Sequence, residues 1–402
     1  MTLSITRTSI QNFALYLYFF SINIENFNLY GYGSISFFSG LIYLLAILPS
    51  IKVMSSLNNN LRYFLPIMIY FVWLVINSLI NVNWYSARVF DVAFFLNIVF
   101  FFAIVNHASK DKLVLEKAFF VFSLGSIFTA TLLFFGIGAE QTDEGLRAAR
   151  TTFFNAGPNE LAIKLVTGAI IIVSMIIQDI LGLGKVRYLL ALFLPLIFIA
   201  VLETGSRTAL LVMPIAGLTW LFFRVVSSRY KVLALISGAI AFIAIFIPIM
   251  FFALQNQVIL DRIAITGGRG DFGEFGRFFL WAGFFNLLGE NLLFGNGLSG
   301  FDLITFKYFG FLESPHNVLL EVLLYTGIVG LIIYALFIYR TVYASYRLYK
   351  DQGRLLPILL LPTIFAYSMA LQALTEKICW LAFAYIVGTY LFNYFPKRIN
   401  SE

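Results

Sequence analysis

The sequence predicts an all-α integral membrane protein that crosses the bilayer about twelve times. Of its 402 residues, 60% are hydrophobic and only 12% are charged, and 46 are phenylalanine. A soluble fold could not bury so much apolar surface. Twelve apolar segments approach the roughly 20 residues that a helix needs to span a bilayer. The predicted spans are 9–24, 34–53, 63–81, 88–106, 114–136, 160–178, 186–203, 207–225, 231–254, 317–339, 355–372 and 377–395.

The charges between these spans predict the orientation. Lysine and arginine gather in alternate short loops, such as 52–62 and 340–354, whereas the opposite loops carry mostly acids. Because cytoplasmic loops are enriched in these cations, we expect both termini in the cytoplasm. No small-residue cleavage site follows the first apolar run, so we interpret that run as an uncleaved anchor. Cations dispersed in this way do not form the basic face that nucleic acid requires, despite a net charge of +7.

Two predicted extracytoplasmic loops stand out within one membrane domain, 1–402. The first is 138–159, and the second, 255–316, is the only long one. Loops of this length usually carry function or are disordered. The aromatic stretches 278–288 and 303–311 indicate that the long loop lies along the membrane interface or packs beneath it.

Several cations contradict the orientation rule, because they lie on or near the extracytoplasmic side. Charges near the bilayer are costly, so those retained mark substrate paths or paired structural sites. Arginine suits phosphate through its planar fork of donors. We therefore expect an anionic lipid head group to bind on this side. The cations are Arg147, Arg150, Lys164, Arg207, Arg269 and Arg277.

Arg207 and Arg277 each have a structural alternative. Arg207 follows a plausible helix cap, Ser206, and could pair with Glu203 one turn earlier. However, a cation in the first helical turn opposes the helix dipole, which favours anion binding. Arg277 could extend to the interface with its stem against Trp281.

The other cations are weaker candidates for a second anion site. Arg147 and Arg150 share their loop with two acids, which favours a solvated charge cluster as the alternative. Lys164 lies four residues after Glu160 and could be neutralised by it. Arg269 lies in a glycine-rich turn and is expected to be solvated.

His316 is the candidate catalytic residue, since it opens an apolar helix in a chain with two histidines. Histidine titrates near neutral pH, and Asn317 can cap the following helix. Glu321 is expected to be a buried carboxylate that needs a partner, and the glycine pair 327 and 330 is expected to let another helix approach. The alternative is an interfacial histidine without a role. The second histidine, His107, is expected at the surface.

Together these motifs resemble the O-antigen ligase and O-antigen polymerase superfamily. The motifs are T-G-S-R (204–207), R-x3-W (277–281), G-N-G-L-S (295–299) and H-N-x9-G-x-x-G (316–330), with FFNAGPNELA (153–162) resembling an earlier segment of many members. The resemblance implies a GT-C-like, multi-span glycosyltransferase without metal or cofactor. It implies a donor glycan on undecaprenyl diphosphate, an acceptor glycolipid, and a site at the periplasmic face of the bacterial inner membrane.

By the same resemblance, Arg207 and Arg277 hold the donor diphosphate and His316 acts on the acceptor hydroxyl. Asn159, Asn317 and Glu321 are supporting candidates. The chemistry agrees, because the departing diphosphate needs positive charge and the acceptor needs a base. The outer loops contain no Asp-x-Asp motif for a metal, so arginines are expected to supply that charge.

Polymerisation is the preferred reaction, since it needs two lipid diphosphates at once and the sequence offers two cation groups. A ligase, which joins the finished glycan to lipid A-core, needs one such site and is the first alternative. A flippase is the second, although its charges would follow a path through the bilayer. Besides its two substrates and membrane lipids, a chain-length regulator is an expected partner.

Overall fold

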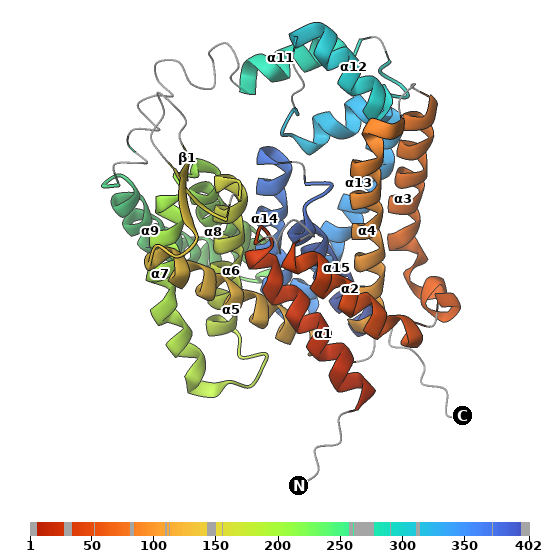
Figure 1. The fold of residues 1–402 in the computed structure, drawn as a ribbon. Coiled ribbons are helices and arrows are strands. Elements are labelled where there is room, and N and C mark those ends of the chain that lie inside the picture. Colours follow the sequence, from red (N-terminus) through yellow and green to blue (C-terminus); the bar gives the residue numbers. More distant parts are fainter. Residues whose placement is uncertain are drawn as a thin grey trace, which may run out of the picture.

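The computed structural model is an all-α fold with one small β-hairpin (Figure 1). The residues that it describes are 6–27, 34–51, 53–80, 84–108, 111, 113–142, 150–154, 156–256, 260, 277–289, 291–310, 314–371 and 373–394. The elements of the first half are α1 Arg7–Ser21, α2 Ile35–Ile47, α3 Val53–Ile80, α4 Trp84–Ala108, α5 Val114–Phe134, β1 Ala139–Thr142, β2 Arg150–Phe153 and α6 Pro158–Ile177. Those of the second half are α7 Leu194–Glu203, α8 Arg207–Ser227, α9 Lys231–Ala253, α11 Arg277–Leu287, α12 Gly297–Phe309, α13 Val318–Gln352, α14 Leu356–Ala370 and α15 Lys377–Tyr394.

The prediction of an all-α polytopic membrane protein is confirmed. Seven of the described helices are long and apolar enough to cross a membrane. Each of the twelve predicted spans overlaps a helix, and the count of twelve crossings stays a prediction. Span 186–203 differs in form, because its first half is a 3-10 helix, Gly184–Phe193, and an α-helix begins only at Leu194.

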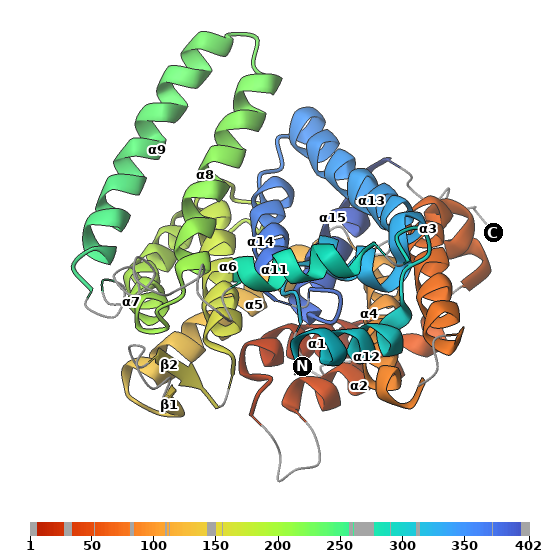
Figure 2. The same cartoon turned by 90° about the horizontal axis from the view of Figure 1, so that it is seen from above.

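The core is centred on α15, whose residues from Ile378 to Leu391 are all buried. Its Trp380 packs against aromatic rings from two other helices, Phe94 and Phe101 of α4 and Phe337 of α13. Helices α3 and α4 lie beside this centre, while α8 and α9 form a pair that projects from the bundle (Figure 2). Large apolar side chains on the outer surfaces of such helices suit contact with lipid.

The loop predicted at 138–159 contains a β-hairpin that the sequence did not indicate. Strands β1 and β2 pair antiparallel, with Ala139 opposite Phe153 and Thr142 opposite Arg150. Each strand has only four residues, too few for a clear alternating pattern. Arg147 lies between the strands and outside the described residues.

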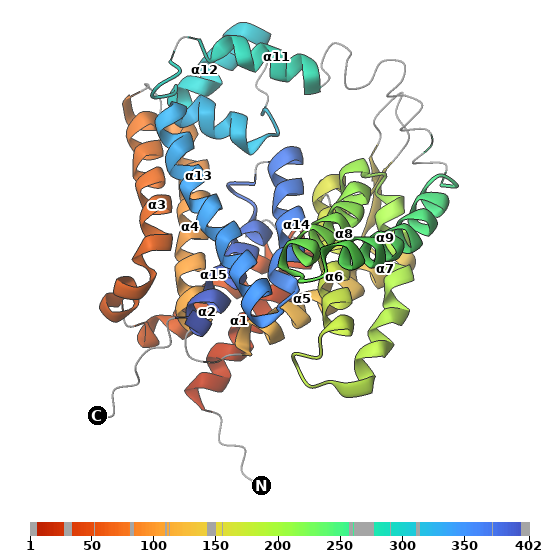
Figure 3. The ribbon, with the colours of Figure 1, turned by 180° about the vertical axis from the view of Figure 1, so that it is seen from behind.

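The described part of the predicted long loop is largely helical. Helices α11 and α12 lie across one end of the molecule, next to the first turns of α13 (Figures 1 and 3). Phe284 of α11 packs against Phe301 of α12, which in turn packs against Tyr325 of α13. The aromatic residues therefore fasten these two helices to α13. Arg269 lies outside the described residues.

Candidate active site

His316 lies directly before α13 in an unusual backbone conformation. Its φ angle is +48°, in the left-handed region that costs energy for a residue other than glycine. Its N–H donates to Ser314 Oγ at 3.2 Å, and the carbonyl of Pro315 accepts from Trp281 Nε1 at 2.8 Å. The side chain of Asn317 caps α13, as predicted, by accepting from the second and third amides of the helix. The conformation of His316 is thus held from both sides.

The contact between Trp281 and Pro315 joins two of the sequence motifs. Trp281 ends the R-x3-W motif in α11, and Pro315 precedes the H-N motif. Arg277 is the first residue of α11, one helical turn before Trp281. The side chain of Arg277 lies outside the described part, so its convergence with His316 stays a prediction.

Glu321 is fully buried and has the partner that its burial requires. Ser314 Oγ donates to Glu321 Oε1 at 2.9 Å, while no described residue hydrogen-bonds to Oε2. Because Ser314 also accepts from the N–H of His316, it bridges the first turn of α13 and the histidine. Glu321 therefore supports the loop that carries His316.

The loop 291–296, which leads into the G-N-G-L-S segment, inserts where α13 breaks. Gly327 has φ +66° and ψ −168°, which no helical residue adopts. Beside this break, the N–H of Ile328 donates to the Leu292 carbonyl at 3.0 Å, and the N–H of Asn296 donates to the Leu324 carbonyl at 2.8 Å. The inserted backbone thus bonds to peptide groups that the break leaves outside the helical ladder.

Two glycines permit this insertion. A Cβ atom on Gly327 would lie 2.3 Å from the carbonyl oxygen of Leu293, and one on Gly295 would lie 2.4 Å from the amide nitrogen of Thr326. The expectation that Gly327 admits another helix is therefore wrong, because a loop approaches instead. Gly330 packs against the side chain of Thr326 in its own helix.

Arg207 begins α8, directly after the turn that closes the T-G-S-R motif. Ser206 caps the helix as predicted, since its Oγ accepts from the N–H of Ala209 at 3.4 Å. Gly205 in the turn has φ +60°, and Thr204 and Ser206 beside it are fully buried. The start of α8 is therefore a tightly bonded turn that presents Arg207.

Arg150 and Asn159 bind this same turn. Arg150 is 6% exposed, so it is not part of a solvated cluster. Its Nε donates to the Thr204 carbonyl and its Nη2 donates to Asn159 Oδ1, both at 2.8 Å. Ser206 Oγ donates to the same Asn159 oxygen at 2.9 Å. The hairpin, the start of α6 and the start of α8 thus meet at one point.

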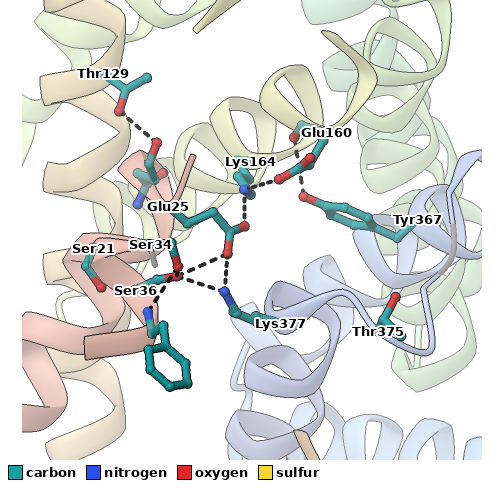
Figure 4. A network of polar contacts seen from close by, with 12 residues as sticks. Ser21, Glu25, Ser34, Ser36, Thr129, Glu160, Lys164, Tyr367, Thr375 and Lys377 are labelled. Atoms are coloured by element: carbon teal, nitrogen blue, oxygen red, sulfur yellow. Dashed lines mark hydrogen bonds and ion pairs between the residues drawn. The ribbon is translucent and has the colours of Figure 1, made fainter. Parts of the chain in front are cut away.

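Lys164 lies in a buried ion-pair network (Figure 4). Its ammonium pairs with Glu160, which was the structural alternative, and also with Glu25. Lys377 donates to Glu25 Oε2 at 2.6 Å. Burial alone would raise the pKa of Glu25, but the two ammonium groups outweigh it and hold that pKa below its ordinary value. Burial raises the pKa of Glu376, next to Lys377, to about 8, and the Glu160 carboxylate adds to the rise.

The end of α14 connects the two halves of the candidate site. Tyr367 donates from its hydroxyl to the Glu160 carbonyl of α6 at 3.4 Å. Two residues later, Met369 Sδ accepts from Asn317 Nδ2 at 3.7 Å. Because Glu160 follows Asn159 and Asn317 follows His316, one helix end touches both groups. Helix α11 lies over α14 in two views (Figures 1 and 2).

Two further expectations concern metals and the second histidine. In the described ranges, no three His, Cys, Asp or Glu side chains lie together as metal ligands would. His107 is buried rather than at the surface, because its ring bonds to Asn12 Oδ1 at 2.8 Å within the helix bundle. It therefore has a packing role there.

Residues 190–335 match the family model described as O-antigen ligase. The match covers 146 of the 402 residues. This region extends from the 3-10 segment before α7 to the middle of α13, so it contains Arg207, Arg277 and His316. The resemblance drawn from the motifs is confirmed over this range. The hairpin, Asn159 and the helices α14 and α15 lie outside it. A comparison with curated proteins finds no match.

The O-antigen ligase motifs did not reveal every residue that organises this site. The sequence indicates Trp281 only as an apolar support for Arg277. In the structure its indole N–H binds the loop of His316. Glu25 and Lys377 were not singled out, since they are more than 300 residues apart in sequence and nothing local marks them as partners. The spacing R-x3-W was the one signal that pointed to Trp281.

Proposed function

We propose that this protein is a glycosyltransferase of surface polysaccharide assembly, which moves a glycan from a polyprenyl diphosphate to an acceptor hydroxyl. The O-antigen ligase region supports the class of reaction. The observation that carries the site is the hydrogen bond from Trp281 to Pro315, since it brings the R-x3-W helix against the loop of His316. Undecaprenyl diphosphate is the proposed carrier, and a glycolipid is the proposed acceptor.

The proposed reaction assigns a role to each group. The bond between the sugar and the diphosphate oxygen breaks, and a bond from the sugar to the acceptor oxygen forms. His316 takes the acceptor proton, and Arg207 and Arg277 stabilise the charge that remains on the diphosphate. Asn317 and Glu321 support the His316 loop. No metal or cofactor takes part in the proposed reaction.

Polymerisation stays the predicted form of this transfer, although fewer cations now support a second anion site. Of the second cation group, Lys164 pairs with two carboxylates and Arg150 binds the turn that presents Arg207. The argument for a second anion site therefore depends on Arg147. Ligation to lipid A-core is the alternative form and needs one diphosphate site. A chain-length regulator is a proposed partner of the polymerase.

We place the protein in the bacterial inner membrane with both termini cytoplasmic and the site facing the periplasm. The loop charges support this orientation. Single cysteines at exposed Lys307 and Lys350, in a variant lacking the buried Cys379, test it. A membrane-impermeant maleimide should label position 307 in intact cells and position 350 only after permeabilisation. The opposite pattern would overturn the orientation and the proposed periplasmic site.

Alanine substitutions test the site directly. His316→Ala, Arg207→Ala and Arg277→Ala should each abolish transfer while the protein still accumulates in the membrane. Replacement of either arginine by lysine should restore little activity if bidentate phosphate contact matters. Arg229→Ala is the matched control, because Arg229 is exposed at the turn between α8 and α9. Parental transfer by His316→Ala would remove His316 from the mechanism, and movement of lipid-linked glycan without a new glycosidic bond would favour the flippase.

A further inference from the structure

Arg150 has the contacts of a residue that organises other groups. Its guanidinium is nearly buried and donates to the Thr204 carbonyl and to Asn159 Oδ1, each at 2.8 Å. Thr204 lies three residues before Arg207, and Asn159 is the second residue of α6. One side chain from the β-hairpin therefore contacts the starts of two helices.

These contacts also determine how the Asn159 amide is turned. A guanidinium carries only donors, so the Asn159 atom that faces Arg150 must be the oxygen. The Ser206 hydroxyl lies 2.9 Å from the same oxygen and donates to it. With its oxygen taken by two donors, Asn159 directs its NH2 group, a pair of hydrogen-bond donors, away from Arg150. The exposure of these side chains agrees with an accessible NH2 group, since Asn159 is only partly buried whereas Arg150 and Ser206 are buried.

The place of Asn159 relates this donor pair to the proposed site. Ser206, which bonds to Asn159, is the residue before Arg207. Glu160, the residue after Asn159, accepts from Tyr367 at the end of α14, and this end also contacts Asn317 beside His316. Asn159 thus lies between the Arg207 turn and the end of α14, which contacts the residue after His316.

We propose that Asn159 contacts the diphosphate of the lipid-linked donor and that Arg150 is the positioning residue that turns the Asn159 amide toward it. The inference rests on the proposed function. Diphosphate oxygens only accept hydrogen bonds, and an amide NH2 supplies two donors without adding charge. Arg150 itself contacts protein groups, so Arg150 and Arg207 serve one anion site and not two.

Asn159→Asp separates substrate contact from structure. The carboxylate has nearly the same shape and still accepts from Arg150 and Ser206, but it lacks the NH2 donors. If Asn159 contacts the diphosphate, the KM for the lipid-linked donor should rise about tenfold or more, while the melting temperature in detergent stays at the parental value. The rise should persist at high salt, because lost contacts are not screened. A parental KM, or a rise that vanishes at high salt, would overturn the contact.

Arg150→Gln tests the positioning role through a double-mutant comparison. If Arg150 acts through Asn159, the two substitutions together should raise KM no further than Asn159→Asp alone. Multiplied effects would show that Arg150 acts independently and would overturn its assignment. Should Arg150→Gln fail to accumulate, Asn159→Asp still decides the contact. Asn393→Asp is the control, because the amide of Asn393 donates to the Thr389 carbonyl in its own helix, α15.

The same assay distinguishes this inference from the proposed function on which it rests. The variants His316→Ala and Arg207→Ala are measured beside Asn159→Asp. If the parent itself forms no new glycosidic bond, the proposed function has failed. If the parent and all three variants transfer glycan equally, the proposed site has failed. If the first two are inactive and Asn159→Asp keeps the parental KM, only the role of Asn159 is overturned.

Discussion

At the scale of single residues, His316 shows how a local strain is maintained. Its positive φ angle is unfavourable for an imidazole-bearing residue, so neighbouring groups must stabilise it. Ser314 holds its N–H, and Trp281 holds the preceding carbonyl. These backbone contacts fix the direction in which the Cα–Cβ bond of His316 points. A proton acceptor needs such a fixed starting point if it is to meet a hydroxyl in line with the sugar.

Trp281→Phe should therefore reduce the rate of transfer without preventing folding. Phenylalanine keeps an aromatic ring at this position and removes the indole N–H that binds Pro315. We expect kcat to fall about tenfold to a hundredfold because His316 is misplaced, with a smaller change in KM. Steady-state kinetics of the purified protein measure both constants. Trp220→Phe is the control, since Trp220 lies near the far end of α8. A parental kcat for Trp281→Phe would show that the hydrogen bond has no positioning role.

The raised pKa of Glu376 predicts that the folded protein loses stability as the pH rises. Burial raises its pKa to about 8 from an ordinary value of 4.5, and the carboxylates of Glu160 and Glu25 reinforce the rise against Lys164 and Lys377. Since the folded state favours the protonated form, its contribution to stability is present below about pH 4.5 and is lost as the pH rises toward 8. The melting temperature should fall across this window, and Glu376→Gln should remove the fall. An unchanged slope in that variant would assign the effect to another group.

At the scale of elements, the break in α13 allows one helix to serve two purposes. The turns before Gly327 carry Asn317 and Glu321 against the His316 loop, and those after it run to the opposite end of the molecule (Figures 1 and 3). The loop 291–296 bonds to the peptide groups at the break, so the change of direction costs few hydrogen bonds. The H-N-x9-G-x-x-G spacing thus places a bend ten residues after the cap.

Gly327→Ala should destabilise the protein more than Gly353→Ala. Both glycines have a positive φ angle, +66° and +67°, so both substitutions incur the backbone cost of about 1–2 kcal/mol. Only at Gly327 would the new Cβ lie 2.3 Å from a backbone oxygen, whereas nothing lies within 4 Å at Gly353. Thermal unfolding in detergent and transfer activity measure the difference. Equal melting temperatures would mean that the inserted loop yields to the methyl group.

At the scale of the whole molecule, the sequence predicted the spans better than the contacts between them. The bilayer imposes a length and an apolar composition on each helix, and both can be read locally. The sequence predicts an α-helix over all of 186–203, because the apolar residues in its 3-10 half are of the kind that also form α-helices. The Lys164 network joins residues up to 352 positions apart, and only its Glu160 pair was local enough to predict.

The difference between local and long-range contacts also explains which parts of the candidate site the sequence could predict. The O-antigen ligase motifs identified the cap by Asn317 and the loop that carries His316, since both are local. The sequence could not show that Arg150 binds the turn before Arg207. The two residues lie 57 positions apart, and the contact forms only when the hairpin folds onto the start of α8. The prediction of two cation groups, one with Arg150 and one with Arg207, therefore rested only on their distance in the sequence.

Deletion of the gene tests which transfer the whole molecule performs. A polymerase lengthens the glycan on its lipid carrier before a separate ligase attaches it, so its loss should leave surface lipid capped by single repeat units. We expect this phenotype, restored to long chains by the parental gene and not by His316→Ala. Loss of a ligase would instead leave the core uncapped, with long glycan accumulating on the polyprenyl diphosphate. That outcome would refute the polymerase and retain the proposed chemistry, because both reactions need the arginines to receive the departing diphosphate and His316 to take the acceptor proton.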